Sequence, residues 1–466
     1  MVVKYTRYFI ERYDHKMKIF IAVILCKLLR FAGKLVNKGS SLPGKIVLKL
    51  FPSILSKIKL PSYVIAVSGS NGKTSTVEMM AHLLSGHGMK VIYNKEGSNQ
   101  IEGVATFLLN NCSLTGKVKA DAVILESDER YARLTFKHFT PTHFVITNLY
   151  RDQMTRNAHS EWIYNILVDA VKKDTTLVLN ANDPLVSRFS RLMNGDKVIY
   201  FSMDENKYST KTSVGKYNDG AHCPVCKEPL DYEFYNMAHI GSFICKNCGL
   251  KTEEALCRVT SVDLNKKQVV FDNAHPVSLA FASTYNVYNL LAAYTVASIL
   301  GFDRAKSAEL LSGYILKNGR VYTRNVNSQK FTLLTSKHEN SVSYNQSIDY
   351  ATRRKNPFKV MFLVDSISRK YYTCETSWLF DVNFDALEKS HCEQIILSGK
   401  YAYDLAARFE YTDIPKKKIT VIPDIKEASR ELFKENVNQK VELFLITCFS
   451  DRDKVTSLIS KKGAMK

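Results

Sequence analysis

The sequence predicts an α/β protein with a central parallel-sheet domain, a small cysteine-rich insertion in that domain, and a smaller α/β domain after it. Three observations support this prediction. An apolar, β-branched run ends in a glycine-rich turn followed by helical spacing, strand and helix patterns alternate downstream, and two Cys-x-x-Cys pairs interrupt them. We expect a basic N-terminal helical segment (1–60), the central domain (61–315, insertion at about 220–252) and a C-terminal domain (316–466).

Composition limits the classes of function. The chain has 466 residues, enough for about three domains, and a formal net charge of +20. A chain this basic implies an acidic partner: nucleic acid, anionic lipid headgroups or a phosphorylated substrate. Six further cysteines lack the spacing of a disulfide framework, so we expect reduced thiols in a cytosolic protein. They are Cys26, Cys112, Cys257, Cys374, Cys392 and Cys448.

The N-terminal segment contains an unbroken apolar run, Ile19 to Cys26, and a second short helix is expected over Lys45 to Ile58. The run is too short to span a bilayer, which needs roughly 20 apolar residues. Two interpretations stay open: a helix lying peripherally on the anionic cytoplasmic membrane face, or a basic helix packed on its own domain. The basic residues within it fit both: Lys16, Lys18, Lys27, Arg30, Lys34 and Lys38. Translation could start at Met1 or Met17.

The stretch that follows has the order strand, glycine-rich loop, helix, which is the order of a phosphate-binding loop. The two glycines let backbone N–H groups turn toward phosphate oxygens, and a helix N-terminus adds partial positive charge. Lys73 would bring its charge to the β- and γ-phosphates, and the Thr74 hydroxyl is placed to ligate Mg²⁺. The alternative is an ordinary strand–helix turn that does not bind phosphate. The candidate nucleotide-binding residues are Gly69, Asn71, Gly72, Lys73, Thr74 and Ser75.

Acidic and amide side chains follow the next expected strands. The run 121–125 delivers Glu126, Asp128 and Glu129 at its carboxyl end, where ligands bind in open α/β sheets. We assign Glu126 as a second Mg²⁺ ligand because it comes first after the strand. Asp128 and Glu129 are expected to face solvent or substrate. The strand 143–147 leads to Asn148 and then to Arg151-Asp152-Gln153.

Four cysteines have the spacing C-x₂-C-x₁₈-C-x₂-C, which is typical of a zinc ribbon. Four thiolates make a closed tetrahedral site, so we expect zinc in a structural role. A pair of disulfides is the alternative, which a cytosolic setting disfavours. The predicted zinc ligands are Cys223, Cys226, Cys245 and Cys248.

Taken in order, several motifs resemble the Mur ligase family. They are the loop 69–74, Glu126, Asn182-Asp183 and Tyr285-Asn286-Val287-Tyr288-Asn289. The four-cysteine insertion, Asn148 to Gln153 and Ser377-Trp378-Leu379-Phe380-Asp381 resemble one branch of it, the MurT subunits of lipid II isoglutaminyl synthase. The resemblance covers most of the chain and implies a Mur-ligase-like central domain with a zinc-ribbon insertion, followed by a Rossmann-like C-terminal domain.

The resemblance also implies a reaction. Such subunits use ATP and Mg²⁺ to phosphorylate the α-carboxylate of D-glutamate in the lipid II stem peptide, and ammonia then gives D-isoglutamine. A glutamine amidotransferase of the GatD type supplies the ammonia in a heterodimer, and Asp381 matches the acidic residue lent to that partner's site. Asn286 and Asn289 match residues that approach the adenine. Arg320 stands where the family has a Gly-Arg-x-Glu motif at the nucleotide.

Four positions depart from the family pattern. The glutamate of Gly-Arg-x-Glu is Tyr322, the turn Lys337 to Gln346 lacks the family's proline and glycine, the loop 365–370 lacks its glycine, and Thr155-Arg156-Asn157 replaces Asp-Arg-Tyr. These changes bear on ribose contacts and loop geometry rather than on the phosphate site. A related chain with weakened catalysis therefore remains an alternative. A second alternative is a zinc-ribbon ATPase that binds nucleic acid, although no basic stripe with interleaved aromatics supports it.

Overall fold

The computed structural model describes residues 15–35, 39–94, 99–153, 157, 159–214, 217–317, 320–326, 329–367, 375–434 and 441–456. It divides into two compact units. The larger unit takes its described residues from 1–149, 161–212 and 220–316, and the smaller from 150–160, 213–219 and 317–466. Residues named above that lie outside the described ranges are Met1, Lys38, Thr155, Arg156, Ser368, Arg369, Lys370 and Cys374.

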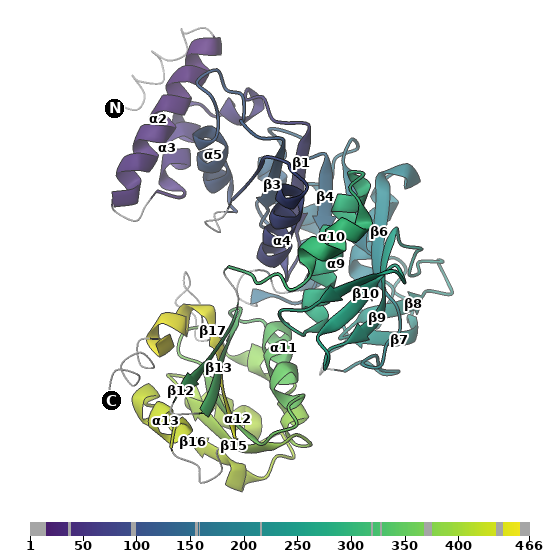
Figure 1. The fold of residues 1–466 in the computed structure, drawn as a ribbon, viewed down its shortest axis with the longest axis vertical. Helices are drawn as coiled ribbons and strands as arrows, with labels where there is room; N and C mark the ends of the chain where they lie inside the picture. Colours follow the sequence, from purple (N-terminus) through teal and green to yellow (C-terminus); the bar gives the residue numbers. More distant parts are fainter. Residues whose placement is uncertain are drawn as a thin grey trace. The chain divides into compact units, whose positions relative to one another are not determined.

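The larger unit is built on a nine-stranded sheet of order β11-β10-β9-β6-β5-β4-β1-β3-β2 (Figure 1). Neighbours from β2 to β9 are parallel, and β10 and β11 add an antiparallel edge. The strands are β1 (Tyr63–Ser68), β2 (Val91–Tyr93), β3 (Ala122–Glu126), β4 (His143–Ile146), β5 (Thr176–Asn180), β6 (Val198–Met203), β9 (Cys257–Asp263), β10 (Gln268–Phe271) and β11 (His275–Ser278).

Strand β1 lies between β3 and β4, and this position determines where a ligand can bind. The chain runs from β1 to β2 and β3 on one side and then crosses to β4 on the other. The carboxyl end of β1 is therefore a topological switch point, where an open α/β sheet leaves a crevice. The glycine-rich loop, residues 69–72, begins at this end.

Helices cover both faces of the nine-stranded sheet. One face packs against α5 (Ile101–Asn110), α6 (Ala132–Thr135), α7 (Ser160–Val168) and α8 (Pro184–Ser187). The other packs against α4 (Lys73–Gly86) and α9 (Thr284–Ile299), with α10 (Arg304–Leu311) beside them. Helix α9 is apolar almost all round and is buried over most of its length, as expected of a helix inside a large domain.

Two N-terminal helices, α2 (His15–Leu35) and α3 (Leu42–Leu50), pack on α5 and share its core. Pro43 lies in the first turn of α3, and Gly44 meets α5 so closely that a Cβ there would lie 1.9 Å from the Glu102 carbonyl oxygen. The expected helix over Lys45 to Ile58 is thus shorter and starts earlier. It ends at Leu50 before Pro52, which cannot continue a helix hydrogen-bond ladder. Within the described residues, no helix combines the length and apolarity needed to cross a bilayer.

The ribbon is inserted between the parallel neighbours β6 and β9, where a helix usually makes the crossover. Its hairpin consists of β7 (Asp231–Met237) and β8 (Ile240–Ile244), which pair antiparallel. The insertion therefore leaves the order of the parent sheet intact.

The smaller unit has a six-stranded sheet of order β12-β13-β17-β14-β15-β16, in which only β12 is antiparallel. Its strands are β12 (Val321–Val326), β13 (Gln329–Ser336), β14 (Phe358–Leu363), β15 (Cys392–Ser398), β16 (Ile419–Val421) and β17 (Glu442–Cys448). One face packs on α11 (Ser341–Thr352) and α12 (Ala402–Phe409), and the other on α13 (Ile425–Leu432). A short 3₁₀ helix, η5 (Ser377–Asp381), buries Trp378 and Leu379 in the first of these cores.

Candidate functional site

The glycine-rich loop is held by the end of the neighbouring strand β4. The Asn71 N–H donates to Asn148 Oδ1 at 2.9 Å, the Thr147 hydroxyl donates to the Asn71 carbonyl at 2.8 Å, and the Ser70 N–H donates to the Asn148 carbonyl at 2.9 Å. These bonds leave the loop little freedom of its own. Asn148 therefore has a positioning role that its place in the sequence did not reveal.

Gly72 caps α4 in a left-handed conformation, with φ of 85°. A Cβ at this position would lie 2.1 Å from Asn289 Oδ1. The same oxygen accepts a bond from the Thr76 hydroxyl at 3.3 Å. Asn289 thus packs directly behind the loop, while Asn286 donates to the Phe281 carbonyl at 3.1 Å. Ser75 lies half-buried in the first turn of α4.

Lys73 is buried and pairs with the buried carboxylate of Glu129, while also donating to the Gly69 carbonyl. Asp128 and Glu129 are both buried, so the expectation that they face solvent is wrong. The turn after Glu126 carries Glu129 back over the loop, where it neutralises the lysine. This pairing joins residues 56 positions apart, which no local pattern in the sequence could indicate.

The Thr74 hydroxyl donates to Glu126 Oε2 at 2.8 Å, so the two side chains chosen as Mg²⁺ ligands do lie together. Asn99 donates to the other carboxylate oxygen at 3.2 Å. The Glu126 backbone is held by Asn94, whose Oδ1 accepts from its N–H at 2.8 Å. The oxygens of Thr74 and Glu126 are the hard donors that Mg²⁺ prefers.

The charge around the loop favours a cation. Glu126, Asp128 and Glu129 are all buried, and Lys73 is the one buried ammonium placed with them among the described residues. Buried carboxylates are costly unless paired or bound to metal. The Glu126 carboxylate beside the Thr74 hydroxyl therefore fits a divalent cation.

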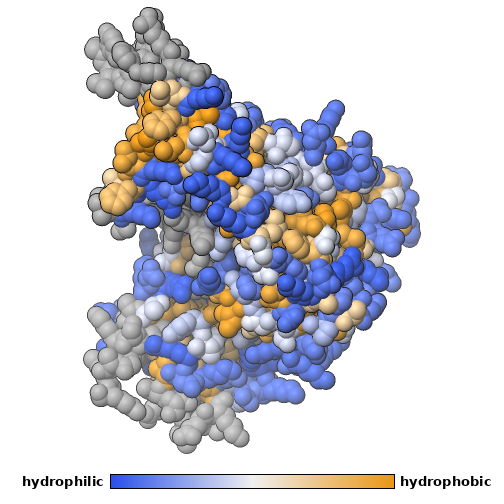
Figure 2. Space-filling view, turned by 45° about the horizontal axis from the view of Figure 1, so that its top comes forward, coloured by the Kyte–Doolittle hydropathy of each residue, from blue (hydrophilic) through white to orange (hydrophobic). Residues whose placement is uncertain are grey.

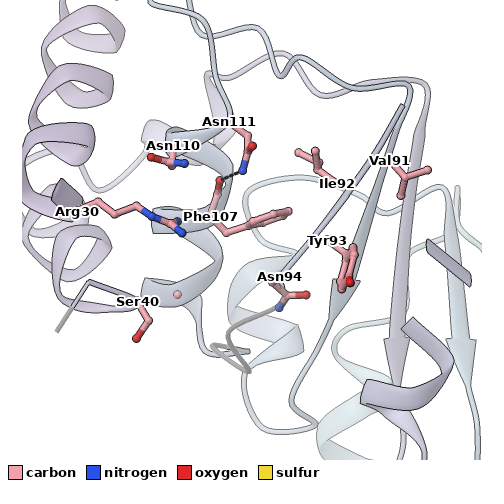
Figure 3. Close-up of a pocket in the computed structure, with 10 residues that line it drawn as sticks. Arg30, Ser40, Val91, Ile92, Tyr93, Asn94, Phe107, Asn110 and Asn111 are labelled. Atoms are coloured by element: carbon pink, nitrogen blue, oxygen red, sulfur yellow. Dashed lines mark hydrogen bonds between the residues drawn. The ribbon is translucent and has the colours of Figure 1, made fainter. Parts of the chain in front are cut away.

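A pocket of about 240 Å³, with both polar and apolar walls, lies between α2, the end of β2 and α5 (Figure 3). Arg30, Tyr93, Asn94 and Asn111 are among the residues that line it. Whole small-molecule sites usually measure about 300–1,000 Å³, so this pocket suits one part of a larger ligand. Asn94 belongs to both the pocket and the support of Glu126.

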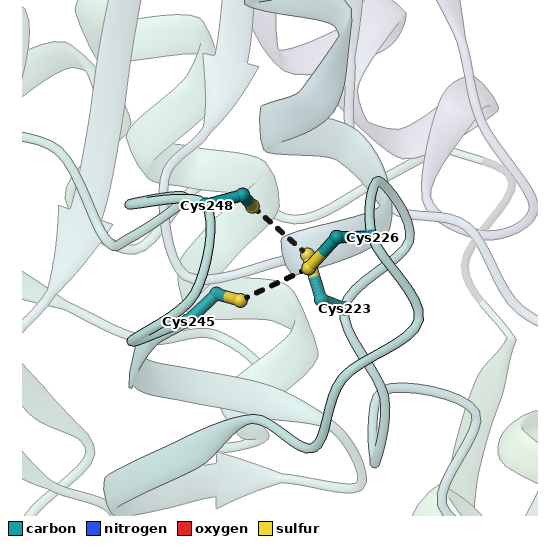
Figure 4. Close-up of side chains that lie close together, drawn as sticks. All are labelled: Cys223, Cys226, Cys245 and Cys248. Carbon is teal, nitrogen blue, oxygen red and sulfur yellow. Dashed lines mark hydrogen bonds between the residues drawn. The ribbon is translucent and has the colours of Figure 1, made fainter.

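The four cysteines of the ribbon converge on one point (Figure 4). Their Sγ atoms all lie within 4.8 Å of one another, with Cys223–Cys248 at 3.5 Å and Cys226–Cys245 at 3.4 Å. These separations are far longer than the ~2.05 Å of a disulfide. Tetrahedral corners about 2.3 Å from zinc would lie roughly 3.8 Å apart. The donor set and its geometry therefore fit zinc.

Each cysteine pair lies on the same kind of tight turn. The Cys223 carbonyl accepts from the Lys227 N–H at 2.9 Å, and the Cys245 carbonyl accepts from the Gly249 N–H at 2.9 Å. Lys227 and Gly249 both have positive φ, 68° and 73°. The two turns thus present their sulfur atoms in matching geometry.

Asn182 anchors the ribbon to the sheet. Its Oδ1 accepts from the Met203 N–H at 2.7 Å and from the Tyr288 hydroxyl at 2.9 Å, and its backbone carbonyl accepts from the Gly241 N–H at 2.9 Å. Asp183 caps α8 by accepting from two backbone N–H groups. The pair Asn182-Asp183 is therefore structural in this chain.

In the smaller unit, Asp381 ends η5 and is half-buried. Burial raises the pKa of its carboxyl to about 6, although Arg151 acts in the opposite direction and Asp219 adds to the rise. Arg151 is itself fixed, because its Nε donates to Asp219 Oδ1 at 2.7 Å and its guanidinium lies 4.4 Å from the centre of the Tyr217 ring. Asp381 thus titrates closer to neutrality than an ordinary aspartate.

Asp152, beside Arg151, holds the start of α11. It is fully buried, pairs with Lys337 and accepts from Asn340 Nδ2 at 2.8 Å. Asn340 in turn caps α11 through the Ser343 N–H at 2.7 Å. Arg320 donates to the Ser343 hydroxyl at 3.3 Å. Arg320 therefore lies against the N-terminal turn of α11.

Comparisons with known proteins agree over most of the chain. Residues 67–297 match the family model of the Mur ligase middle domain, and residues 338–449 match that of the MurT ligase C-terminal domain. The chain is 30% identical to the Streptococcus pneumoniae protein "Lipid II isoglutaminyl synthase (glutamine-hydrolyzing) subunit MurT", over 92% of this chain and 95% of that protein. Identity to the Staphylococcus aureus (strain COL) protein of the same name is 28%, over 85% and 89%.

Solved structures show the same fold. A pseudomurein peptide ligase type C from Methanothermus fervidus has a TM-score of 0.63 at 21% identity, covering 90% of this chain and 84% of that one. MurF from Acinetobacter baumannii has a TM-score of 0.62 at 15% identity, over 89% and 80%. Since the identity to the pneumococcal protein extends through both units, the chain belongs to the MurT branch of the Mur ligase family.

Proposed function

We propose that this chain is the synthase subunit of a lipid II isoglutaminyl synthase. It is an ATP-dependent carbon–nitrogen ligase that converts the α-carboxylate of D-glutamate in the lipid II stem peptide to the amide of D-isoglutamine. The observation that carries the proposal is the sequence identity between this chain and curated MurT subunits over nearly the full length of both. The hydrogen bonds that hold the glycine-rich loop and join Thr74 to Glu126 agree with it.

The reaction has two steps. A carboxylate oxygen of the substrate attacks the γ-phosphorus of ATP, the bond from phosphorus to the ADP oxygen breaks, and an acyl phosphate forms. Ammonia then attacks the acyl carbon, the carbon–oxygen bond to phosphate breaks, and inorganic phosphate and a proton leave. Lys73 and the N-terminus of α4 would neutralise charge on the transferring phosphoryl group.

We assign the nucleotide to one set of residues: Gly69, Asn71, Gly72, Lys73, Thr74, Ser75, Asn286, Asn289 and Arg320. Mg²⁺ would be held by Thr74 and Glu126, and when bound it supplies further positive charge at the phosphates. The contact between Thr74 and Glu126 supports this assignment. Lys73 and Glu126 are accordingly the proposed catalytic residues of the larger unit.

Asp381 is the proposed catalytic residue of the smaller unit. It would lend its carboxylate to the cysteine–histidine site of a glutamine amidotransferase of the GatD type, in a heterodimer. A carboxylate that orients an imidazolium must be ionised, which its pKa of about 6 allows at neutral pH. The exposed Phe380 and Tyr411 next to it offer aromatic surface for such a partner.

Three further assignments belong to the proposal. Zinc occupies the four-cysteine site and stabilises the ribbon. The chain works in the cytoplasm, at the membrane face where its lipid-linked substrate is found. Its parts are an N-terminal helical segment (1–60), a central ATP-binding domain (61–315) and a MurT-type C-terminal domain (316–466).

The test is amidation of lipid II by the purified chain with a co-expressed glutamine amidotransferase subunit, followed by mass spectrometry. We expect Lys73→Ala to abolish amidation with either glutamine or ammonia. Asp381→Asn should abolish the glutamine-dependent reaction and spare the ammonia-dependent one. Equal loss of both in Asp381→Asn would remove its assigned role. ATP turnover stimulated by DNA or RNA instead of lipid II would overturn the proposal, and ATP binding without turnover would identify a chain that has lost catalysis.

A further inference from the structure

The outward face of α2 carries a continuous row of apolar side chains: Met17, Phe20, Ile24, Leu28 and Phe31. We refer to this row as the α2 stripe. Its spacing of three or four residues places all five side chains on one side of the helix. The opposite side contributes Ile19, Ala22, Val23 and Cys26 to the core shared with α3 and α5. Helix α2 is therefore apolar on two opposite faces, and only one of them is covered within the described residues.

The exposure of the stripe is large. Phe31 is 73% exposed, Leu28 63%, Met17 45% and Phe20 40%. Single exposed apolar residues are ordinary, but a contiguous apolar patch marks an interaction surface. Figure 2 shows hydrophobic residues gathered over these N-terminal helices, next to a strongly hydrophilic surface. The α2 stripe is therefore a candidate binding surface.

The charge of this segment indicates which occupant fits. Residues 15–59 contain ten Lys or Arg and no Asp or Glu. At 100° per residue, Lys16, Lys27 and Lys34 fall along one border of the α2 stripe. Lys16 and Lys34 are exposed, and Lys27 is tied by a 2.9 Å bond to the Cys112 carbonyl. A protein partner would usually be met by charges of both signs, whereas an anionic lipid surface demands cations alone.

We propose that the α2 stripe is the surface by which this chain binds a membrane containing anionic phospholipid. The helix lies parallel to the bilayer, its stripe enters the boundary between headgroups and acyl chains, and the lysine border contacts the headgroups. Helix α2 lies on the membrane and does not cross it, because α3 and α5 cover its inner face. The inference deepens the proposed function, since it would bring the enzyme to a lipid-linked substrate.

The test is sedimentation of the purified full-length chain with sucrose-loaded vesicles, of phosphatidylcholine with about one quarter phosphatidylglycerol and of phosphatidylcholine alone. We expect binding to the anionic vesicles that weakens in high salt. The variant Leu28→Gln/Phe31→Gln keeps good helix propensity at position 28 and makes both sites polar. It should bind at least about tenfold more weakly. Lys16→Gln/Lys34→Gln should lose most of the preference for phosphatidylglycerol.

A matched control is Ile315→Gln/Tyr403→Gln, which removes two similarly exposed side chains outside α2. This control should bind vesicles like the unmodified chain. Absence of vesicle binding by the unmodified chain, or equal binding by Leu28→Gln/Phe31→Gln, overturns the proposal. A dimer in solution that this variant converts to a monomer, without vesicle binding, would assign the stripe to self-association. Vesicle binding is measured without ATP or partner, so its outcome is separate from the outcome of the amidation assay.

Discussion

Lys73 has two tasks that can be separated by mutation. It is the proposed phosphate ligand, and it is also the cation that neutralises the buried Glu129. Removing one member of a buried ion pair is far more costly than removing a surface pair, because the remaining charge stays buried. Stability and catalysis therefore both depend on this side chain.

We expect Lys73→Met to lower the free energy of unfolding of the larger unit by about 3–5 kcal/mol, since Glu129 loses its cation. Adding Glu129→Gln should restore most of that loss without restoring amidation. Urea unfolding measures the free energy of unfolding of the single and the double variant. Arg133→Met, which breaks the exposed pair with Asp169, is the control and should cost no more than about 1 kcal/mol. Similar costs for Lys73→Met and the control would contradict the pairing.

Asp381 gives a prediction that needs no partner protein. Because folding raises its pKa from 3.8 to about 6, the native state holds this proton more tightly than the unfolded chain does. Its contribution to stability is therefore lost as the pH rises from about 4 to about 6. Asp381→Asn should raise the Tm of the smaller unit at pH 8 by about 1–3 °C, an amount reduced by partial exposure, with no gain at pH 4. Scanning calorimetry at the two pH values measures this difference. A lower Tm of Asp381→Asn than of the unmodified chain at pH 8 would show that the carboxylate has a purely structural role.

At the scale of elements, the ribbon has little core of its own. Its buried cluster consists of Leu230, Phe243 and Leu250 around two of the cysteines, so a metal bound by the four thiolates would supply much of its stability. Asn182 also bonds the hairpin to the sheet.

We expect one zinc per chain by elemental analysis. Cys245→Ser/Cys248→Ser should lose it and make residues 223–250 exchange amide hydrogen rapidly, because metal and folding are coupled on the order of 10 kcal/mol in such sites. Cys257→Ser, which alters a buried cysteine outside the cluster, should keep the metal. Retention of zinc by the double variant would rule out the site.

The elements differ in how well the sequence predicts them. Strand β1, its loop and α4 are contiguous, so their pattern is complete in one stretch, and the structure places the Thr74 hydroxyl in hydrogen-bond contact with Glu126. The sequence does not predict helix α11, because Ser341–Thr352 is mostly polar and its helix depends on the Asn340 cap and on packing against β13 and β17. Strand β12 is not predicted either, because it is an edge strand with mixed polarity. Long-range pairs such as Lys73 with Glu129 leave no local pattern.

At the scale of the whole molecule, nucleotide binding should be visible as stabilisation. A ligand that binds only the folded state at 100 times its Kd adds about 2.7 kcal/mol. We expect ATP with Mg²⁺ to raise the Tm of the larger unit accordingly and to leave Lys73→Ala unaffected. A thermal shift titration with ATP, and with AMP as the control that lacks β- and γ-phosphates, measures this. An equal shift with AMP would place recognition away from the phosphate loop.

The backbone passes between the two units five times, at 149/150, 160/161, 212/213, 219/220 and 316/317. A fragment beginning at residue 317 would therefore keep Asp381 and Lys337 but lack Arg151, Asp152 and Asp219. Such a fragment would not reproduce the smaller unit of the intact protein. It would therefore be a poor choice for expressing that unit alone or for exchanging it between relatives. Dissection of this protein is better served by point substitutions in the intact polypeptide.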